Sequence, residues 1–416
     1  MFDYDKWQEI FTTIKKNKLR TFLTVFGIFW GIFMIVILLG AGKGLENGIQ
    51  RDFSAFATNS GFIWGQKTTI SYDGYKPGRY IRYNNEDRRL LLAKVPELRY
   101  LAPRNQLSGF GGGNNVIYGE NSGTFSVYGD YPDFGKIESR DIYNGRFIND
   151  LDIEKERKVA VIGENVRKVL FEEDEDPMGK YIQINRVNFQ VVGVFKSLRS
   201  GERGDRDTQT IFVPFSTFQT AFHYGDRIGW FAYSAKEEFD AGEVEAKMID
   251  ILREQHSVHP RDEDAIGHFN LQEEFKEISG LFTGMNLFTW FVGISTLFAG
   301  IIGVSNIMLI IIKERTREIG IRKSLGATPL SIVSLVIQES VFLTTIGGYT
   351  ALVFGIFLLE AINQVIPKDG FFGATEIDIQ VAIGALLILI IGGAAAGILP
   401  ATKAAKINPI EAIRTE

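Results

Sequence analysis

The chain contains no cysteine, and only four of its 416 residues are histidines. The lack of cysteine excludes a disulfide framework, a thiolate metal site and a cysteine nucleophile. The formal net charge of −5 is too small to indicate a nucleic-acid-binding protein. Aromatic residues are plentiful, with 33 Phe, 14 Tyr and 5 Trp, and this supply of core-forming side chains excludes intrinsic disorder.

Motifs that mark catalytic or metal sites are also missing. The sequence has no G-x-x-x-x-G-K-[ST] phosphate loop and no G-x-S-x-G nucleophile elbow. The triple glycine Gly111–Gly113 lacks a strand–turn–helix context and is interpreted as a flexible loop. His256 and His259 lack a third zinc ligand at suitable spacing, and the acidic run 172–176 lacks the pattern of a calcium loop. We therefore expect a chain that is not an enzyme and that holds no cofactor or metal.

Four long segments are almost free of charged residues. Thr21–Gly42 and Ile278–Ile312 have none, and two more apolar segments follow toward the C-terminus. About 20 apolar residues span a bilayer core of about 30 Å, whereas the apolar region of a cleaved signal peptide is shorter. Three such runs close together also argue against the core of a soluble domain. We predict transmembrane helices at 21–43, 278–312, 329–360 and 379–402. The second is longer than one crossing, so it should tilt or project beyond the bilayer.

The flanking segments predict the orientation of these helices. Basic residues gather in 1–20, in the link 313–328 and in the tail 403–416. Because short basic segments stay in the cytoplasm, both termini and this link are predicted to be cytoplasmic. The block 44–277 and the loop 361–378 are then outside. We therefore expect the chain to cross a membrane several times.

The first 20 residues have a separate pattern. Apolar residues recur there at helical spacing, at Phe2, Trp7, Ile10, Phe11 and Ile14. This pattern favours an amphipathic helix that lies on the inner membrane surface. An ordinary packed helix before the first span is the alternative.

The outside block has the pattern of a mixed α/β domain. Strands are predicted at 158–163 and 210–213, a hairpin with an Asn-Arg turn at 181–195, helices at 84–92 and 243–255, and loops at 109–115 and 200–207. The flanks 44–57 and 268–282 also have helical spacing. They are predicted to pair as a stalk between the domain and the membrane.

Glu339 is a lone carboxylate inside the third apolar segment. Intramembrane carboxylates are costly, so Glu339 is a candidate intramembrane polar site. A role in a proton path is one hypothesis. A helix–helix contact or an interfacial position is the favoured one.

The link after the second apolar segment combines charge with apolar residues. Ser305–Ala327 reads SNIMLIIIKERTREIGIRKSLGA, and its apolar positions Ile319, Ile321 and Leu325 suggest a docking surface rather than a simple basic anchor. Here the sequence resembles the MacB-type, FtsX-like permeases of ABC transporters. Further matching segments are 17–21 (NKLRT), 400–412 (PATKAAKINPIEA), 145–147 (GRF), 159–163 (VAVIG), 177–179 (PMG) and 191–194 (VVGV).

The resemblance implies a permease that dimerises and binds cytoplasmic ATPase subunits through a coupling helix. The residues that would make this contact are Arg317, Glu318, Ile319, Gly320, Ile321, Arg322 and Lys323. Aspartate at both Ile319 and Ile321 would then abolish docking. ATP and Mg²⁺ are expected on the partner ATPase, because the chain shows no ATPase domain. Whether the permease is a homodimer or a heterodimer stays open.

The resemblance also implies the architecture, a location in a bacterial inner (plasma) membrane that the chain crosses several times, and the function. The expected fold is an α+β membrane protein with four transmembrane helices and a large outside α/β domain on a helical stalk. Its two lobes would be 58–125 with 216–265, and 126–215. The expected function is efflux of a peptide, antibiotic or other amphiphile by mechanotransmission, with a periplasmic adaptor and an outer-membrane channel. Control of a cell-wall hydrolase, lipoprotein release, and a non-transporting sensor or scaffold are the alternatives.

The predicted topology is tested by a reporter enzyme fused after residue 150. If the block 44–277 is outside, the reporter is active only outside the cytoplasm. Cytoplasmic activity of this fusion would contradict the topology.

Overall fold

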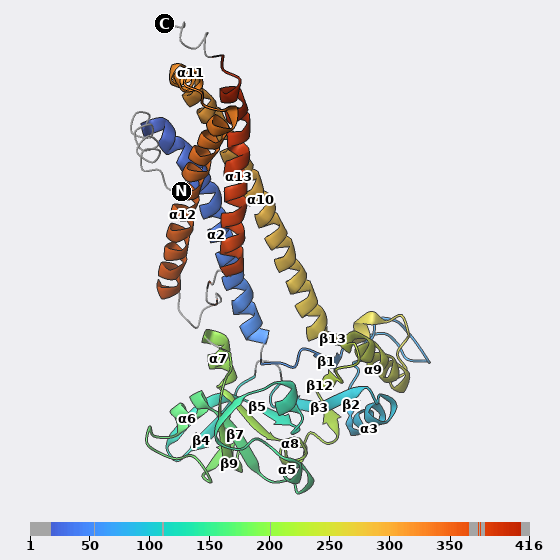
Figure 1. The fold of residues 1–416 in the computed structure, drawn as a ribbon. Helices are drawn as coiled ribbons and strands as arrows, with labels where there is room; N and C mark the ends of the chain where they lie inside the picture. Colours follow the sequence, from blue (N-terminus) through green and yellow to red (C-terminus); the bar gives the residue numbers. More distant parts are fainter. Residues whose placement is uncertain are drawn as a thin grey trace. The chain divides into compact units, whose positions relative to one another are not determined.

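The structure is a computed structural model. It describes residues 18–408 apart from 54, 110–111, 200, 366–372, 374 and 376–378. Two compact units divide the chain, a helical one (Met1–Gly48 with Leu281–Glu416) and an α/β one (Ile49–Gly280) (Figure 1). The predicted N-terminal amphipathic helix falls almost wholly outside the described residues, as does most of the 361–378 loop.

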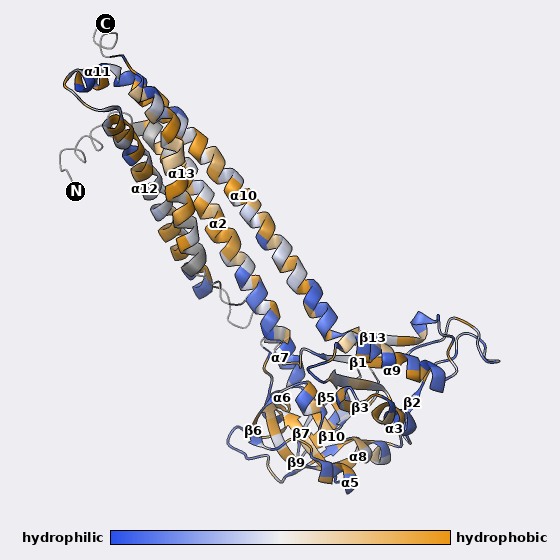
Figure 2. Cartoon of the chain, turned by 45° about the vertical axis from the view of Figure 1, so that its right-hand side comes forward, coloured by the Kyte–Doolittle hydropathy of each residue, from blue (hydrophilic) through white to orange (hydrophobic). Residues whose placement is uncertain are grey.

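The helical unit consists mainly of long apolar helices. Its described helices are α2 (Lys18–Phe53), α10 (Leu271–Glu314), α11 (Thr316–Ser324), α12 (Pro329–Val365) and α13 (Ile379–Ala405). Figure 2 shows hydrophobic residues along the long helices. Three of them are long and apolar enough to cross a membrane, whereas the apolar stretch identified in α13 is the shorter Ile390–Ala405. The count of four spans therefore stays a prediction.

The length of α10 agrees with the uninterrupted second apolar segment. Its 44 residues correspond to about 66 Å of helix, roughly twice the thickness of a bilayer core. The helix runs without a break from the helical unit into the α/β unit, as α2 also does. Near its start, the ring of Phe275 lies edge-on to the ring of Phe53 at the end of α2, with the centroids 6.3 Å apart.

Small residues bring α13 close to α12. A Cβ atom added at Gly393 would overlap the side chain of Thr344, and one at Gly397 would crowd Ser340. In lipid, where close packing rather than hydrophobic exclusion holds helices together, such glycines permit the approach. The run IGGAAAG in the sequence is thus part of a helix–helix interface.

A single mixed sheet runs through the α/β unit. Its strands are β1 (Ser60–Gly65), β3 (Leu98–Gln106), β4 (Asn114–Tyr118), β5 (Asn121–Asp130), β6 (Asp141–Gly145), β7 (Val159–Gly163), β8 (Tyr181–Ile184), β9 (Val187–Lys196), β10 (Thr210–Pro214), β12 (Trp230–Ala235) and β13 (Ile266–Asn270). The order is β10-β7-β9-β8-β4-β5-β3-β12-β1-β13, with β6 beside β9. Because β10 also pairs with β5, six strands close into a ring. The short strands β2 (Tyr83–Asn84) and β11 (Arg227–Ile228) form a separate pair.

Short helices complete this unit. They are α3 (Asn85–Lys94), α4 (Phe134–Ile137), α5 (Asp150–Glu154), α6 (Glu164–Leu170), α7 (Gly201–Asp207), α8 (Phe215–Ala221), α9 (Ala241–Gln255) and the 3-10 helix Glu263–Ala265. The predicted helices and strands are present. The hairpin β8–β9 turns at Asn185 and Arg186, whose φ angles of 42° and 73° match a type I′ turn.

Several local predictions were wrong. Residues 55–57, expected to be helical, lie beyond the end of α2 at Phe53, and residues 361–365, expected in a loop, belong to α12. Residues 201–207, expected to be a loop, form α7, because Ser197 and Arg199 bind the Asp207 side chain and Glu202 pairs with Arg206. Residues 114–115 belong to β4 rather than to a loop. Residues 268–270 belong to β13, and the helix begins only at Leu271.

The buried apolar residues of this unit form three clusters. One combines residues from both ends of the unit, between 63 and 101 and between 215 and 266. A second spans 107–218 and includes Val116 and Phe125, which precede the lobe boundary predicted near residue 125. The third joins residues of β3, β7, β9, β10 and β12. The two-lobed layout stays a prediction. The second cluster contains residues of both β4 and β5, so residues on the two sides of the predicted boundary pack in one cluster.

A buried ion pair lies where β3 meets β5. Arg104 donates to both carboxylate oxygens of Asp130, at 2.5 and 3.0 Å, and the Asp130 side chain is fully buried. The guanidinium carbon of Arg104 also lies 3.5 Å from the ring centroid of Phe134 and 5.4 Å from that of Trp230. The aromatic rings and the bidentate carboxylate together replace the water that this cation loses.

Replacing Asp130 with Ala leaves the buried Arg104 without its carboxylate partner. Removal of one member of a buried pair lowers the free energy of unfolding by about 3–5 kcal/mol. The thermal unfolding midpoint of the purified chain should therefore fall. The control is Glu237→Ala, which removes an exposed partner of Arg99 and should cost less than about 1 kcal/mol. Equal midpoints for the two variants would contradict a structural role for the buried pair.

Candidate coupling site

The backbone leaves the helical conformation on both sides of α11, which limits this helix to a short segment. Arg315 leaves the helical conformation between α10 and α11, with φ −98° and ψ 13°. After Leu325, Gly326 has a φ of +98°, which favours glycine, and Ala327 N–H donates to Arg322 C=O at 3.0 Å. Pro329 then begins α12, a position that proline tolerates.

The faces of α11 differ in exposure. Ile319 and Gly320 are buried, with Ile319 packed in the apolar core of the helical unit. Ile321 is 45% exposed and Leu325 is 83% exposed, and Arg317 is exposed as well. Ile319 and Gly320 thus pack inside the chain, whereas Arg317 and Ile321 lie on its surface. The predicted contact of residues 317–323 with an ATPase stays a prediction.

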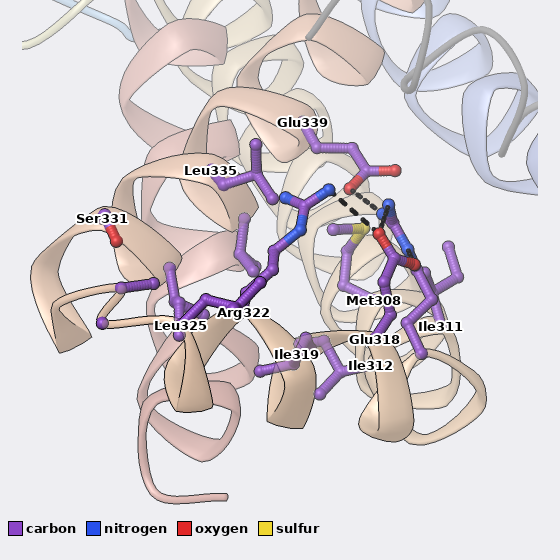
Figure 3. A pocket seen from close by; sticks show the side chains of 15 residues that line it. Met308, Ile311, Ile312, Glu318, Ile319, Arg322, Leu325, Ser331, Leu335 and Glu339 are labelled. Atoms are coloured by element: carbon purple, nitrogen blue, oxygen red, sulfur yellow. Dashed lines mark hydrogen bonds and ion pairs between the residues drawn. The ribbon is translucent and has the colours of Figure 1, made fainter. Parts of the chain in front are cut away.

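Arg315 connects α11 to α12. Its guanidinium donates to both oxygens of Glu318, at 3.0 and 3.2 Å, and its Nη1 lies 3.6 Å from Glu339 Oε2 (Figure 3). The Glu339 side chain is only 4% exposed. Arg322 also donates to Glu318, at 3.0 Å. Glu339 thus takes part in a helix–helix contact, and two predicted contact residues, Glu318 and Arg322, belong to the same ion network.

Lys323 connects α11 to the end of α13. Its ammonium group donates to the carbonyl oxygens of Ala405 and Ile407, both at 2.8 Å. The last carbonyl groups of a helix lack partners within the helix, and a basic side chain stabilises them. Lys323 is therefore a positioning residue. Its partners are about 80 residues away in the sequence, so the local pattern contains nothing that indicates this role.

A cavity of about 470 Å³ lies between α10, α11 and α12 (Figure 3). It is lined by Met308, Ile311, Ile312, Arg315, Glu318, Ile319, Arg322, Leu325, Gly326, Ala327, Ser331, Ile332, Leu335, Val336 and Glu339. Most of these side chains are apolar. The charged ones are the members of the ion network. The sequence identified the segment 313–328 but not the cavity. One wall of the cavity is formed by α12, which lies outside that segment.

No cluster of metal-binding side chains occurs among the described residues. His256 lies with Nε2 3.0 Å from each oxygen of the buried Asp87. This contact joins the end of α9 to α3. His256 therefore has a structural role in the α/β unit.

Comparison with known proteins identifies the family. Residues 21–251 match the family described as MacB-like periplasmic core domain, and residues 290–409 match the one described as FtsX-like permease C-terminal. The chain belongs to the FtsX-like permeases that carry a MacB-like periplasmic core domain. The resemblance carried by the ERTREIGIR segment is thereby confirmed.

Two of the relatives carry names that describe export. The chain is 30% identical to the pyoverdine export ATP-binding/permease protein PvdT of Pseudomonas entomophila, over 96% of this chain and 58% of the relative. It is 26% identical to the macrolide export ATP-binding/permease protein MacB of Bdellovibrio bacteriovorus, over 98% and 61%. The chain thus spans about three-fifths of the length of these relatives. Among solved structures, the periplasmic region of MacB from Actinobacillus actinomycetemcomitans matches with a TM-score of 0.44 and 20% identity, over 55% of this chain and 96% of that one.

Within this MacB-like permease, replacing Glu339 with Leu should weaken the contact between α11 and α12. Arg315 then keeps its contact with Glu318 but loses the buried carboxylate on α12. The free energy of unfolding should fall by about 1–3 kcal/mol. The measurement is the melting temperature of the detergent-purified chain. Gln338→Leu is the matched control, because Gln338 is the exposed neighbour of Glu339 on the same helix.

The pair Glu339→Leu and Arg315→Met tests the same contact by a double-mutant cycle. The combined variant should lose less stability than the two single variants summed, because each removes the same interaction. Strict additivity would show that the two side chains do not act together.

Proposed function

We propose that this chain is the permease of an ABC exporter and that α11 is the surface that contacts a cytoplasmic P-loop ATPase. The observation that carries the proposal is the exposed face of α11. Ile321 on this short helix and Leu325 directly after it are exposed apolar side chains outside the long apolar helices, beside the exposed cation of Arg317. An apolar anchor next to an arginine is typical of a protein–protein contact.

The inner face of α11 supports its role as a coupling element. Ile319 packs in the core, Arg315 reaches Glu339 on α12, and Lys323 holds the end of α13. Because these three contacts join α11 to its neighbours, a displacement of α11 would displace the neighbouring helices as well. A movement that an ATPase imposes on α11 would therefore pass to α12 and α13.

The continuity of α10 supports transmission to the outside domain. Only the break at Arg315 separates α11 from this 44-residue helix, whose other end follows β13 of the α/β unit. We place α11 and both termini in the cytoplasm and the α/β unit in the periplasm. ATP hydrolysis would then drive the periplasmic unit mechanically.

The relatives favour export as the purpose of this movement. Their names describe export of pyoverdine and of macrolides. A peptide, an antibiotic or another amphiphile is the corresponding substrate class for this chain. A dimer of the permease, a periplasmic adaptor and an outer-membrane channel complete the proposed assembly.

Replacing Ile321 with Asp tests the proposed ATPase contact. The new charge lies at the centre of the exposed face, so recovery of a P-loop ATPase with the purified chain should fall by at least about tenfold, a loss of about 1.4 kcal/mol. Recovery is measured by affinity purification and mass spectrometry. The variant should fold normally, because Ile321 is exposed, whereas Ile319→Asp would damage the core.

The control is Leu198→Asp, the same kind of change at an exposed residue of the α/β unit. It should leave ATPase recovery unchanged. Undiminished recovery with Ile321→Asp would overturn the assignment of α11 as the contact surface.

A further inference from the structure

The joint between α9 and the start of α10 contains a buried carboxylate. Glu245 of α9 has a side chain that is only 5% exposed. Its Oε2 accepts a hydrogen bond from Asn270 Nδ2 at 3.3 Å and lies 3.4 Å from His268 Nδ1. Within the described part of the chain its Oε1 makes no hydrogen bond, and nor does the buried hydroxyl of Tyr233 on β12. A buried carboxylate with so few partners is costly when it is ionised.

The charges around this cluster also oppose ionisation of Glu245. Asp240 at the N-terminus of α9 and Glu273 in the first turn of α10 are acidic, whereas His268 on β13 is the basic group that faces the carboxylate. Lys276 pairs instead with Asp240, at 2.9 Å. Burial raises the pKa of the Glu245 carboxyl above its ordinary value, and the charge of Glu273 adds to this effect. His268 and the hydrogen-bond donors around the carboxylate lower this pKa without offsetting burial.

The same cluster holds the first turn of α10. Asn270 Oδ1 accepts hydrogen bonds from the backbone N–H groups of Gln272 and Glu273, at 3.0 and 3.2 Å. Gln272 Oε1 in turn accepts a hydrogen bond from the N–H group of Ala241, the first residue of α9, at 2.8 Å. The Asn270 side chain therefore links the N-terminus of α10 to Glu245, and a change in the charge of Glu245 acts on this contact.

We propose that protonation of Glu245 controls how firmly the start of α10 is held in the α/β unit. With a proton on its carboxyl group, Glu245 is neutral and does not repel Glu273. Loss of the proton places a buried negative charge beside the first turn of α10 and loosens that turn. The attachment of α10 then depends on the pH on the side of the membrane where the α/β unit lies. The proposal requires no ATPase contact, so it is tested independently of the proposed function.

The direction of the pH dependence follows from the raised pKa. Around neutral pH the folded carboxyl holds a proton more readily than the same group in the unfolded chain. Ionised Glu245 therefore destabilises the joint at pH values above its folded pKa. This destabilisation is relieved as the pH falls through the folded pKa toward the unfolded one.

Hydrogen exchange of the full-length, detergent-purified chain at about pH 5 and about pH 8 is the test. Exchange of the amides in 271–276 is compared between the wild type and Glu245→Gln at the same pH, so the intrinsic pH dependence of exchange cancels. Glutamine has no charge and mimics the protonated carboxyl. At about pH 8 the wild-type segment should exchange about threefold faster than that of the variant, or more, and at about pH 5 the difference should vanish. No difference at either pH, or the same difference at both, would overturn the proposal.

Two further variants identify the titrating group. Glu254→Gln, the same substitution at an exposed position of α9, is the matched control and should exchange like the wild type at both pH values. His268→Gln removes the basic neighbour, so the pH dependence should persist with its midpoint at a higher pH. Loss of the pH dependence in His268→Gln, with its retention in Glu245→Gln, would assign the proton to His268 and contradict the role of Glu245.

Discussion

The organisation of the helical unit depends on the placement of one cation, Arg315. It stands at the break between α10 and α11, where the chain leaves the long helix, and it is only 19% exposed. A partly buried guanidinium needs carboxylates nearby, and the chain supplies Glu318 from α11 and Glu339 from α12. This requirement explains why a carboxylate is tolerated within an apolar helix. The contacts of Arg315 also fix the rotation of α11 about its own axis, so that Ile319 faces the core and Ile321 faces outward.

The two ends of α10 are both anchored by polar side chains. At the start of the helix, Asn270 Oδ1 accepts hydrogen bonds from the N–H groups of Gln272 and Glu273, and its Nδ2 donates to Glu245 of α9. At the other end Arg315 ties the chain to α12. Between these anchors the helix is continuous, and from Ile278 to Ile312 it has no charged residue. Such an element transmits displacement better than one joined to its domain by a loop.

Much of the architecture was predictable because it is encoded locally. The apolar segments, the hairpin at Asn185 and Arg186, and the amphipathic helix α9 follow from periodicity and turn chemistry. The helix α7 did not, because contacts of Ser197 and Arg199 with Asp207 override a loop-like composition. Tertiary context outweighs local propensity there.

The candidate site was predictable as a segment but not as a surface. The spacing of apolar residues in ERTREIGIR indicates a helix, yet both Ile319 and Ile321 fit a docking face on sequence alone. Which of them is buried depends on α12 and α13, and so do the roles of Lys323 and Glu339. Contacts between distant segments decide these points, and a single sequence does not contain them explicitly.

Site-specific photo-crosslinking from α11 in intact cells tests the central claim most directly. A photoreactive amino acid at Arg317 lies on the exposed face and disturbs none of the contacts that position α11. The account predicts a crosslink to a P-loop ATPase domain, whether on this polypeptide or on another. An intact chain that crosslinks only to lipid, or to proteins on the periplasmic side, would contradict it.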